Sequence, residues 1–246
     1  MSVLDVKGLC KYYKSFCLED INFSVEQGSI MGFIGRNGAG KTTTIKSMLN
    51  IVHRDAGDIS FFGLDILAHE DEIKNRTGYA GGAADYYKRR KISDIVDVTK
   101  RFYKSWDDAE YRRYMDAFSL DESKKPMELS EGMKVKLSLV MALSHHAELL
   151  ILDEPTSGLD PVSREELLED FKFLRDRGVS VFFSTHITSD LEKCADYITY
   201  ISSGRLIASK PLDEFIKDGA AAGMGSTIDD IMVSCEKESL YDKLAL

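Results

Sequence analysis

The sequence has 246 residues, of which 43% are hydrophobic and 30% are charged, and its formal net charge is −9. This composition excludes a disordered, collagen-like or coiled-coil chain, and the acidic balance argues against a dedicated nucleic-acid-binding protein. No apolar run approaches the ~18 residues of a membrane span, and the first residues lack a signal-peptide pattern. The four cysteines form no CxxC pair, so we expect reduced thiols in a cytoplasmic protein.

The chain begins with strand signals. Residues 1–34 alternate and turn like short strands, and the apolar run Ile30–Ile34, which leads directly into glycines, predicts a buried strand. From Lys41 to Val52, apolar side chains recur at the spacing of one helix face. A strand, a glycine-rich turn and a helix are therefore expected in that order.

The middle of the chain has helical periodicity instead. Apolar residues keep helical spacing from Ile92 to Tyr103 and from Tyr111 to Phe118. A third helix, apolar nearly all round and therefore buried, is predicted from Ser130 to Ser144. We interpret residues 83–146 as an all-helical insertion.

Strands and helices alternate again after the insertion. Leu149–Leu152 and Val179–Phe183 are predicted strands, and Ser163–Arg177 is a predicted helix between them. Such alternation predicts a parallel sheet with right-handed crossovers.

The last part of the chain contains three further patterns, which predict a hairpin, a linker and a short helix. Tyr197–Ile201 and Arg205–Ala208 are predicted to form a hairpin. The Ala/Gly-rich stretch Gly219–Gly225 is interpreted as a linker. Thr227 and Asp230 resemble a capping box, so a short amphipathic helix is predicted to follow.

The segment Gly35-Arg36-Asn37-Gly38-Ala39-Gly40-Lys41-Thr42 fits the phosphate-loop pattern GxxxxGK(S/T). Its glycines allow successive N–H groups to face phosphate oxygens, and the following helix directs its positive end at the same anion. Lys41 is expected to reach the β- and γ-phosphates, and the Thr42 hydroxyl is expected to ligate Mg²⁺. The preceding strand and following helix are the context that this motif requires.

A second motif is an apolar strand that ends in two carboxylates, Asp153 and Glu154. In open α/β sheets, ligands bind at the carboxyl ends of strands. Asp153 is expected to hold the Mg²⁺ shell, and Glu154 is expected to polarise the attacking water as general base. The two motifs together predict a nucleoside-triphosphatase.

Further segments narrow this class: Tyr13 upstream of the phosphate loop, Leu129–Met133, Ser157–Asp160 and His186. A GTPase reading lacks an NKxD motif, and a helicase reading leaves Leu129–Met133 unexplained. The ordered set resembles the ATP-binding subunit of ABC transporters over about residues 3–216.

The resemblance implies an α/β fold, a P-loop NTPase (RecA-like) core with a mainly parallel sheet, an N-terminal antiparallel β subdomain and an inserted α-helical subdomain. We expect the nucleotide-binding core in residues 1–82 and 147–216 and the helical signature subdomain in residues 83–146. Residues 217–246 are expected to form a C-terminal linker and a short helix.

The resemblance also implies ATP and Mg²⁺ as cofactors. The expected catalytic residues are Glu154, His186, Lys41 and Asp153, and the expected metal ligands are Thr42 and Asp153. The expected nucleotide contacts are Tyr13, Asn37, Gly38, Ala39, Gly40, Lys41, Thr42, Thr43, Ser130, Gly132 and Asp160.

Several of these roles have an alternative. Tyr13 would stack on adenine, or it is a strand aromatic in the core. His186 would bind the γ-phosphate, or it is structural. Ser130 would reach ATP held by a second subunit, or it only caps a helix. Asp160 would cross the dimer interface.

Two departures from the family pattern concern coupling. Glu131 and Met133 replace the glycine and glutamine of the usual LSGGQ signature. The family's loop glutamine is missing, because Gln27 is the only glutamine in the chain; Gly82 is the best match for its position, and Asp85 is the nearest polar residue. Together with residues 184–192, these departures resemble bacterial exporters of peptides, lantibiotics or drugs.

We therefore expect an ATPase that dimerises head-to-tail, as a homo- or heterodimer, and drives a separate transmembrane permease from the inner face of the membrane. Two alternatives stay open: a regulatory module that dimerises on ATP with little hydrolysis, and a soluble non-transport ABC ATPase. The basic run Lys88–Lys91 is either a solvated surface or a contact with the membrane partner or anionic lipid heads. Nucleic acid is not an expected partner.

Overall fold

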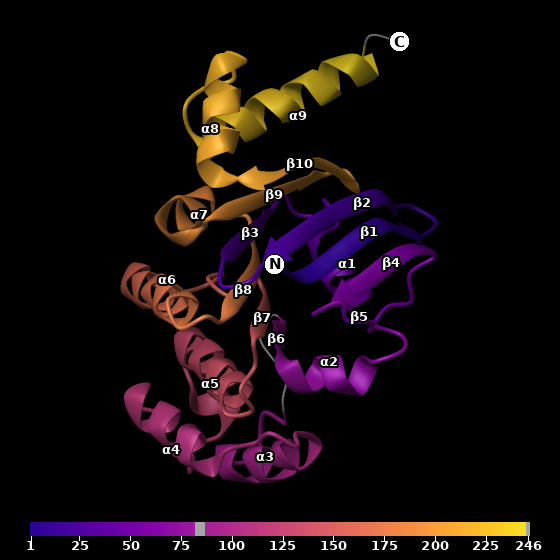
Figure 1. The fold of residues 1–246 in the computed structure, drawn as a ribbon. Coiled ribbons are helices and arrows are strands. Elements are labelled where there is room, and N and C mark those ends of the chain that lie inside the picture. The colour runs from indigo at the N-terminus through magenta and orange to yellow at the C-terminus, as the bar shows by residue number, and fades with distance from the viewer. Residues whose placement is uncertain (82–86, 245–246) are drawn as a thin grey trace.

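The structure, a computed structural model, describes residues 1–81 and 87–244, with side chains to residue 237 (Figure 1). Its strands are β1 (Ser2–Tyr12), β2 (Cys17–Glu26), β3 (Ile30–Ile34), β4 (Ala56–Phe61), β5 (Leu64–Asp65), β6 (Thr77–Gly81), β7 (Leu149–Asp153), β8 (Ser180–Thr185), β9 (Tyr197–Ser202) and β10 (Arg205–Pro211). Within the described residues they form one ten-stranded sheet in the order β5-β4-β1-β2-β10-β9-β3-β8-β7-β6.

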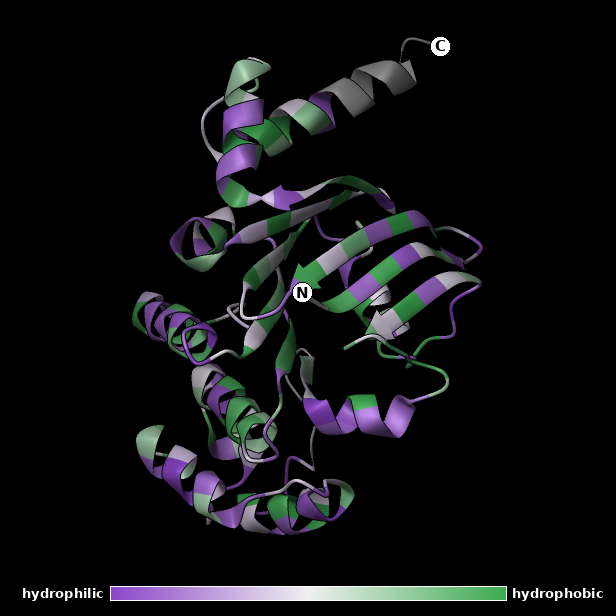
Figure 2. Cartoon of the chain, viewed as in Figure 1, coloured by the Kyte–Doolittle hydropathy of each residue, from purple (hydrophilic) through white to green (hydrophobic). Residues whose placement is uncertain are grey.

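The sheet has a parallel and an antiparallel part. Strands β6, β7, β8, β3 and β9 run parallel, and every residue of β3, β7 and β8 is buried. Strands covered on both faces are continuous apolar runs, as in Ile30–Ile34. Strands β1, β2, β4 and β5 pair antiparallel, and Figure 2 shows polar and apolar residues alternating along them. The predicted fold class is confirmed, and β9 and β10 form the predicted hairpin.

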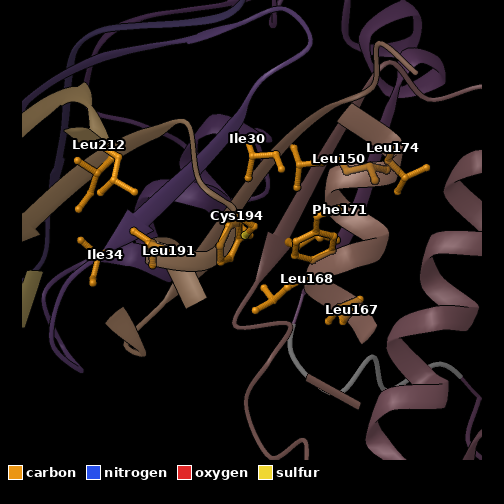
Figure 3. Packing of buried hydrophobic residues seen from close by; sticks show 14 of the residues in the cluster. Ile30, Ile34, Leu150, Leu167, Leu168, Phe171, Leu174, Leu191, Cys194 and Leu212 are labelled. Carbon is orange, nitrogen blue, oxygen red and sulfur yellow. The ribbon is translucent and has the colours of Figure 1, made fainter. Parts of the chain in front are cut away.

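Helices cover both faces of the sheet. They are α1 (Lys41–Met48), α2 (Glu70–Arg76), α6 (Pro161–Arg175), α7 (Thr188–Cys194), α8 (Leu212–Ala221) and α9 (Ile228–Leu244). Phe171 of α6 and Leu191 of α7 pack with apolar side chains of the parallel strands (Figure 3). Ile45 and Met48 of α1 belong to a second cluster, shared with the antiparallel strands. These two cores fix the carboxyl ends of β3, β7 and β8 relative to each other.

The described residues between β6 and β7 form helices and turns around a cluster of their own. The elements are α3 (Ile92–Thr99), η1 (Lys100–Phe102), α4 (Asp108–Ala117), η2 (Pro126–Glu128) and α5 (Glu131–Leu143). Ile92, Tyr111 and Val140 belong to this cluster. Leu139 on α5 joins the main core instead, so α5 connects the helical segment to the sheet.

Two expected boundaries are wrong. The first helix ends at Met48 rather than Val52. The predicted linker Gly219–Gly225 begins too early, because α8 continues to Ala221 and includes Gly219. A Cβ at Gly219 would lie 2.2 Å from Ile231 Cδ1, so this glycine permits close packing with α9 rather than flexibility.

The final helix is longer than predicted. Helix α9 has 17 residues, and Ile228 and Ile231 on it are buried. The predicted cap is present, since the Asp230 N–H donates to Thr227 Oγ1 at 3.2 Å. In the described part of the chain, α9 is the longest helix, and no helix there is long and apolar enough to cross a bilayer.

Candidate functional site

The phosphate loop connects the carboxyl end of β3 to the first turn of α1. Gly38 and Gly40 have φ values of 84° and 116°, in the region that favours glycine. A Cβ at Gly40 would lie 2.6 Å from Leu18 Cδ2, and a Cβ at Gly35 would lie 2.3 Å from the Ile201 carbonyl oxygen. The loop therefore needs glycine for both backbone conformation and close packing.

A hollow of about 670 Å³ lies over this loop. It is lined by Ser15, Phe16, Arg36, Asn37, Gly38, Gly40, Lys41, Thr42, Thr43, Glu154, Ser157 and His186. Eight of these lining residues are predicted site residues: six lie in the phosphate loop and the first turn of α1, and the other two, Glu154 and His186, come from two separate parts of the chain. The fold thus brings the phosphate loop, the acidic strand end and the segment after β8 to one place.

Glu154 connects two cationic or potentially cationic groups in the hollow. Its Oε1 lies 3.1 Å from Lys41 Nζ, and its Oε2 lies 2.8 Å from His186 Nδ1. Lys41 is 5% exposed and also donates to the Gly35 carbonyl at 2.7 Å. Glu154 itself has φ 54°, a strained conformation for a residue with a Cβ. The carboxylate therefore occupies the hydrogen-bonding capacity that an anionic ligand would take.

Asp153 is held by a residue that the sequence analysis did not single out. Its Oδ1 accepts a 2.6 Å hydrogen bond from Ser184 Oγ, and the same hydroxyl accepts the Glu154 N–H at 2.9 Å. Asp153 and Ser184 are register partners on β7 and β8. Only the strand order reveals this contact, because the two residues are 31 positions apart.

The aromatic residue in the hollow is Phe16, which the sequence analysis also missed. A Cβ at Gly40 would lie 2.9 Å from Phe16 Cζ, so the ring lies against the phosphate loop. Tyr13 is 48% exposed, and it is not among the residues that line the hollow in the described structure. Its proposed stacking on adenine stays a prediction.

Ser130 and Asp160 begin two neighbouring helices. Ser130 Oγ accepts the Met133 N–H at 3.2 Å, and Asp160 Oδ1 accepts the Val162 N–H at 3.0 Å. Hydrogen bonds from the Ser163 hydroxyl and N–H, together with the bond from Val162, lower the pKa of the Asp160 carboxyl. A Cβ at Gly132 would lie 3.4 Å from Ser163 Cβ, so the two helix N-termini are adjacent.

The adjacent N-termini of α5 and α6, with Ser130, Gly132 and Asp160, form the signature end of the molecule. This signature end does not line the hollow of its own chain. Among the described lining residues, Ser130, Gly132 and Asp160 are absent, and so are the buried Ala39 and Asp153. Glu131, one departure from the usual signature, pairs with Lys134 at 2.6 Å. The loop positions Gly82 and Asp85 lie outside the described residues.

A polar cluster lies beneath the segment that carries Glu154. Three of its side-chain atoms are buried without a hydrogen-bond partner in the described structure: Thr156 Oγ1, Arg164 Nε and Asp190 Oδ2. Burial raises the pKa of the Asp190 carboxyl, and the Thr156 hydroxyl, Arg164, Lys193 and His186 oppose the rise. Asp190 lies on α7, in the segment that follows His186, and is buried.

This fold and this hollow define a P-loop ATPase, and comparisons with known proteins specify the family. The family model described as "ABC transporter" matches residues 18–157, which is more than half of the chain. The chain therefore belongs to the ABC transporter family, and it is an ATP-hydrolysing, ATP-binding subunit of that family.

Individual relatives agree with this. The "Bacitracin transport ATP-binding protein BcrA" of Bacillus licheniformis is 32% identical over 220 residues, which are 88% of this chain and 72% of that protein. The "ABC transporter ATP-binding protein YtrB" of Bacillus subtilis is 32% identical over 198 residues, 80% and 68% of the two chains. A solved structure described as "Structure of ATP binding subunit of ABC transporter" superimposes with a TM-score of 0.84 at 30% identity, covering 95% of this chain and 99% of that one.

Proposed function

We propose that this chain is the motor of an exporter: two nucleotide-binding subunits close head-to-tail around ATP and drive a separate membrane-spanning subunit. The observation that carries the proposal is the chain of contacts Lys41–Glu154–His186 at the hollow. An entering triphosphate would take over Lys41, which frees Glu154 to accept a proton from the attacking water. His186 would then hold the γ-phosphate.

Thr42, which lines the hollow, and the buried Asp153 at the end of β7 fit a Mg²⁺ ion. This cation is usually held by one or two carboxylates together with substrate phosphates and water. Thr42 lies in the first turn of α1, and Asp153 ends β7 with its carboxylate fixed by Ser184. When bound, the ion would neutralise charge on the β- and γ-phosphates.

The signature end supports the dimer. Ser130, Gly132 and Asp160 lie at adjacent helix N-termini, which favour negative charge, yet they do not line their own hollow in the described structure. A second subunit placed head-to-tail would bring these N-termini to the opposite triphosphate. Because Lys134 pairs with Glu131, the extra carboxylate in the signature is partly neutralised.

The substrate class follows from relatives and is part of the proposal. BcrA carries bacitracin transport in its name and shares most of this chain's length. Together with the departures at Glu131 and Met133, this supports a peptide, lantibiotic or drug-like substrate. The chain would then act at the cytoplasmic face of a membrane, through its permease partner.

The structure extends the basic run Lys88–Lys91 into a patch. The Met127 N–H donates to the Lys88 carbonyl at 3.3 Å, and the Ile92 N–H donates to the Lys124 carbonyl at 2.9 Å. These bonds place Lys124 and Lys125 beside the run, and all six basic side chains are exposed. A patch of this sign on an acidic protein supports a contact with the membrane partner or with anionic headgroups.

The catalytic proposal is tested with Glu154→Gln. The variant should bind ATP, lose at least about a hundredfold in turnover and accumulate as a dimer in the presence of ATP. Turnover is measured as phosphate release, and dimerisation by light scattering. Retained turnover in this variant would show that Glu154 is not the base.

The patch is tested by reversing Arg89, Arg90 and Lys91 to Glu together. Recovery of the protein with cell membranes should fall more than tenfold, since each of the three basic residues near an anionic surface contributes about 1 kcal/mol, while ATP binding should not change. The control reverses three exposed basic residues elsewhere, Lys7, Arg177 and Lys237. Equal recovery of both variants would remove the patch from the proposal.

The missing loop glutamine favours a second candidate, a regulatory module that dimerises on ATP with little turnover. Near-zero phosphate release from the wild type, even with its permease present, would support this candidate over the motor.

A further inference from the structure

We propose that Glu236 of the C-terminal helix is a positioning residue for Arg36 of the phosphate loop, and that nucleotide and Glu236 compete for this arginine. The inference rests on the proposed function in one respect, that the hollow binds ATP. It adds a contact between the nucleotide site and a helix outside the matched family region, residues 18–157.

The first half of α9 is fixed to the core. Ile228 and Ile231 are 0% and 3% exposed, and Ile231 packs onto the bare backbone of Gly219 in α8. Ser234 Oγ donates to the Met224 carbonyl at 3.1 Å. Glu236 therefore projects from a helix whose position is determined by buried packing.

The two carboxylate oxygens of Glu236 serve different partners. Oε1 accepts hydrogen bonds from Tyr200 Oη at 3.1 Å and from Ser202 Oγ at 2.6 Å. Oε2 lies 3.7 Å from Arg36 Nη1. Tyr200 is fully buried, and burial, together with the nearby Glu236 charge, raises its pKa. Oε1 thus satisfies a buried phenol, which leaves Oε2 for the arginine.

The end of β9 lies against the phosphate loop. The Gly204 N–H donates to the Ala39 carbonyl at 2.9 Å, and a Cβ at Gly35 would lie only 2.3 Å from the Ile201 carbonyl oxygen. Glu236, the end of β9 and the phosphate loop are therefore in continuous contact. A change at Arg36 can reach α9 through Glu236 without passing through the sheet.

Arg36 is placed to meet the ligand as well. It lines the hollow, and its side chain is 73% exposed, whereas that of Glu236 is 23% exposed. A guanidinium can form two parallel N–H···O hydrogen bonds with either a phosphate or a carboxylate, so both groups fit its geometry. An ion pair with so much exposure is weak, so a polyphosphate can displace the carboxylate.

The test distinguishes the two roles of the Glu236 carboxylate, which are to accept hydrogen bonds from Tyr200 and Ser202 and to pair with Arg36. Glu236→Gln keeps an acceptor for Tyr200 and Ser202 but removes the charge that holds Arg36. We expect ATP affinity, measured with a fluorescent ATP analogue, to rise about two- to fivefold. Arg36→Gln should weaken binding by a similar factor, and adding Glu236→Gln to it should change nothing further. Tyr200→Phe is the matched control: it removes one hydrogen bond to Oε1 but keeps the Glu236 charge beside Arg36, so it should leave affinity unchanged.

A second measurement follows α9 itself. Backbone amides of α9 in the wild type should exchange hydrogen faster with ATP than without it, and this difference should disappear in Glu236→Gln. Unchanged affinity in Glu236→Gln, or an equal effect in the Arg36→Gln background, would overturn the inference while wild-type ATP binding stands. A wild type that binds no ATP would instead overturn the proposed function together with the competition.

Discussion

The phosphate-loop end and the signature end of this chain differ in the contacts that their proposed site residues make within one chain. At the phosphate-loop end, Lys41, Glu154 and His186 already contact one another within one chain. At the signature end, the side chains of Ser130 and Asp160 make, among the described residues, only local bonds within the first turn of their own helices. The first end is complete without a partner, and the second has an exposed polar surface. This difference is the basis of our proposal that one chain binds nucleotide and that two are needed for turnover.

The largest effect is expected at Ser130. Ser130→Ala should lower stability by about 1 kcal/mol through loss of the cap, and reduce turnover about a hundredfold or more through loss of a donor to the opposite triphosphate. ATP binding to the single chain should not change. Phosphate release, thermal unfolding and nucleotide binding are measured in parallel.

Ser130→Asp separates the two roles of this side chain. Aspartate caps a helix as well as serine does, so stability should return to the wild-type value. Turnover should stay low, because a carboxylate repels the triphosphate. Recovery of turnover with the cap would mean that Ser130 acts only on its own helix.

A smaller effect concerns the aromatic side of the hollow. Phe16→Ala should weaken ATP binding about tenfold, because stacking of a base on an aromatic ring contributes about 1–3 kcal/mol. Tyr13→Ala should cost less, since Tyr13 is outside the lining. Titration with pyrophosphate, which has no base, is the control and should give equal affinities. A larger loss at Tyr13 would support the family-based assignment instead.

The smallest effect concerns Asp170 on α6, whose carboxyl is partly buried near Lys136 of α5 and Glu166. Burial raises the pKa of the Asp170 carboxyl to about 6, well above its ordinary value. The folded chain therefore holds this proton more tightly than the unfolded chain, so stability falls as pH rises from about 4 to 6. Asp170→Asn cannot ionise, and its Tm should exceed the wild-type value by about 3 °C at pH 8 and match it at pH 4.

The control for this prediction is Asp229→Asn, which changes an exposed carboxylate on α9. Its Tm should follow that of the wild type at both pH values. A gain for Asp170→Asn that is equally large at pH 4 would point to packing rather than to ionisation.

Local motifs were predictable from the sequence, and contacts across strands were not. The phosphate loop and the acidic strand end are contiguous segments whose residue types are dictated by their chemistry, so the pattern alone identifies them. Ser184 reaches Asp153 only because β8 lies beside β7. Arg36 and Glu236 are 200 positions apart, and nothing in either local pattern indicates that they meet.

Glycine and phenylalanine misled the sequence analysis for physical reasons. The sequence predicts Gly219 as part of a linker, but it lies in α8, where Ile231 leaves no room for a side chain. Phe16 lies in the turn between β1 and β2 and belongs to no motif, and this turn places its ring over Gly40. In both cases tertiary contact, rather than local propensity, decides the outcome.

The left-handed backbone of Glu154 has a consequence for laboratory evolution. A residue with a Cβ costs roughly 1 kcal/mol or more in this conformation, and glycine does not. Random variants selected for heat resistance alone should therefore enrich Glu154→Gly or Glu154→Asn, which relax the backbone and remove the proposed general base. Selection for thermal stability alone would therefore yield variants without ATPase activity, unless each round also selected for transport.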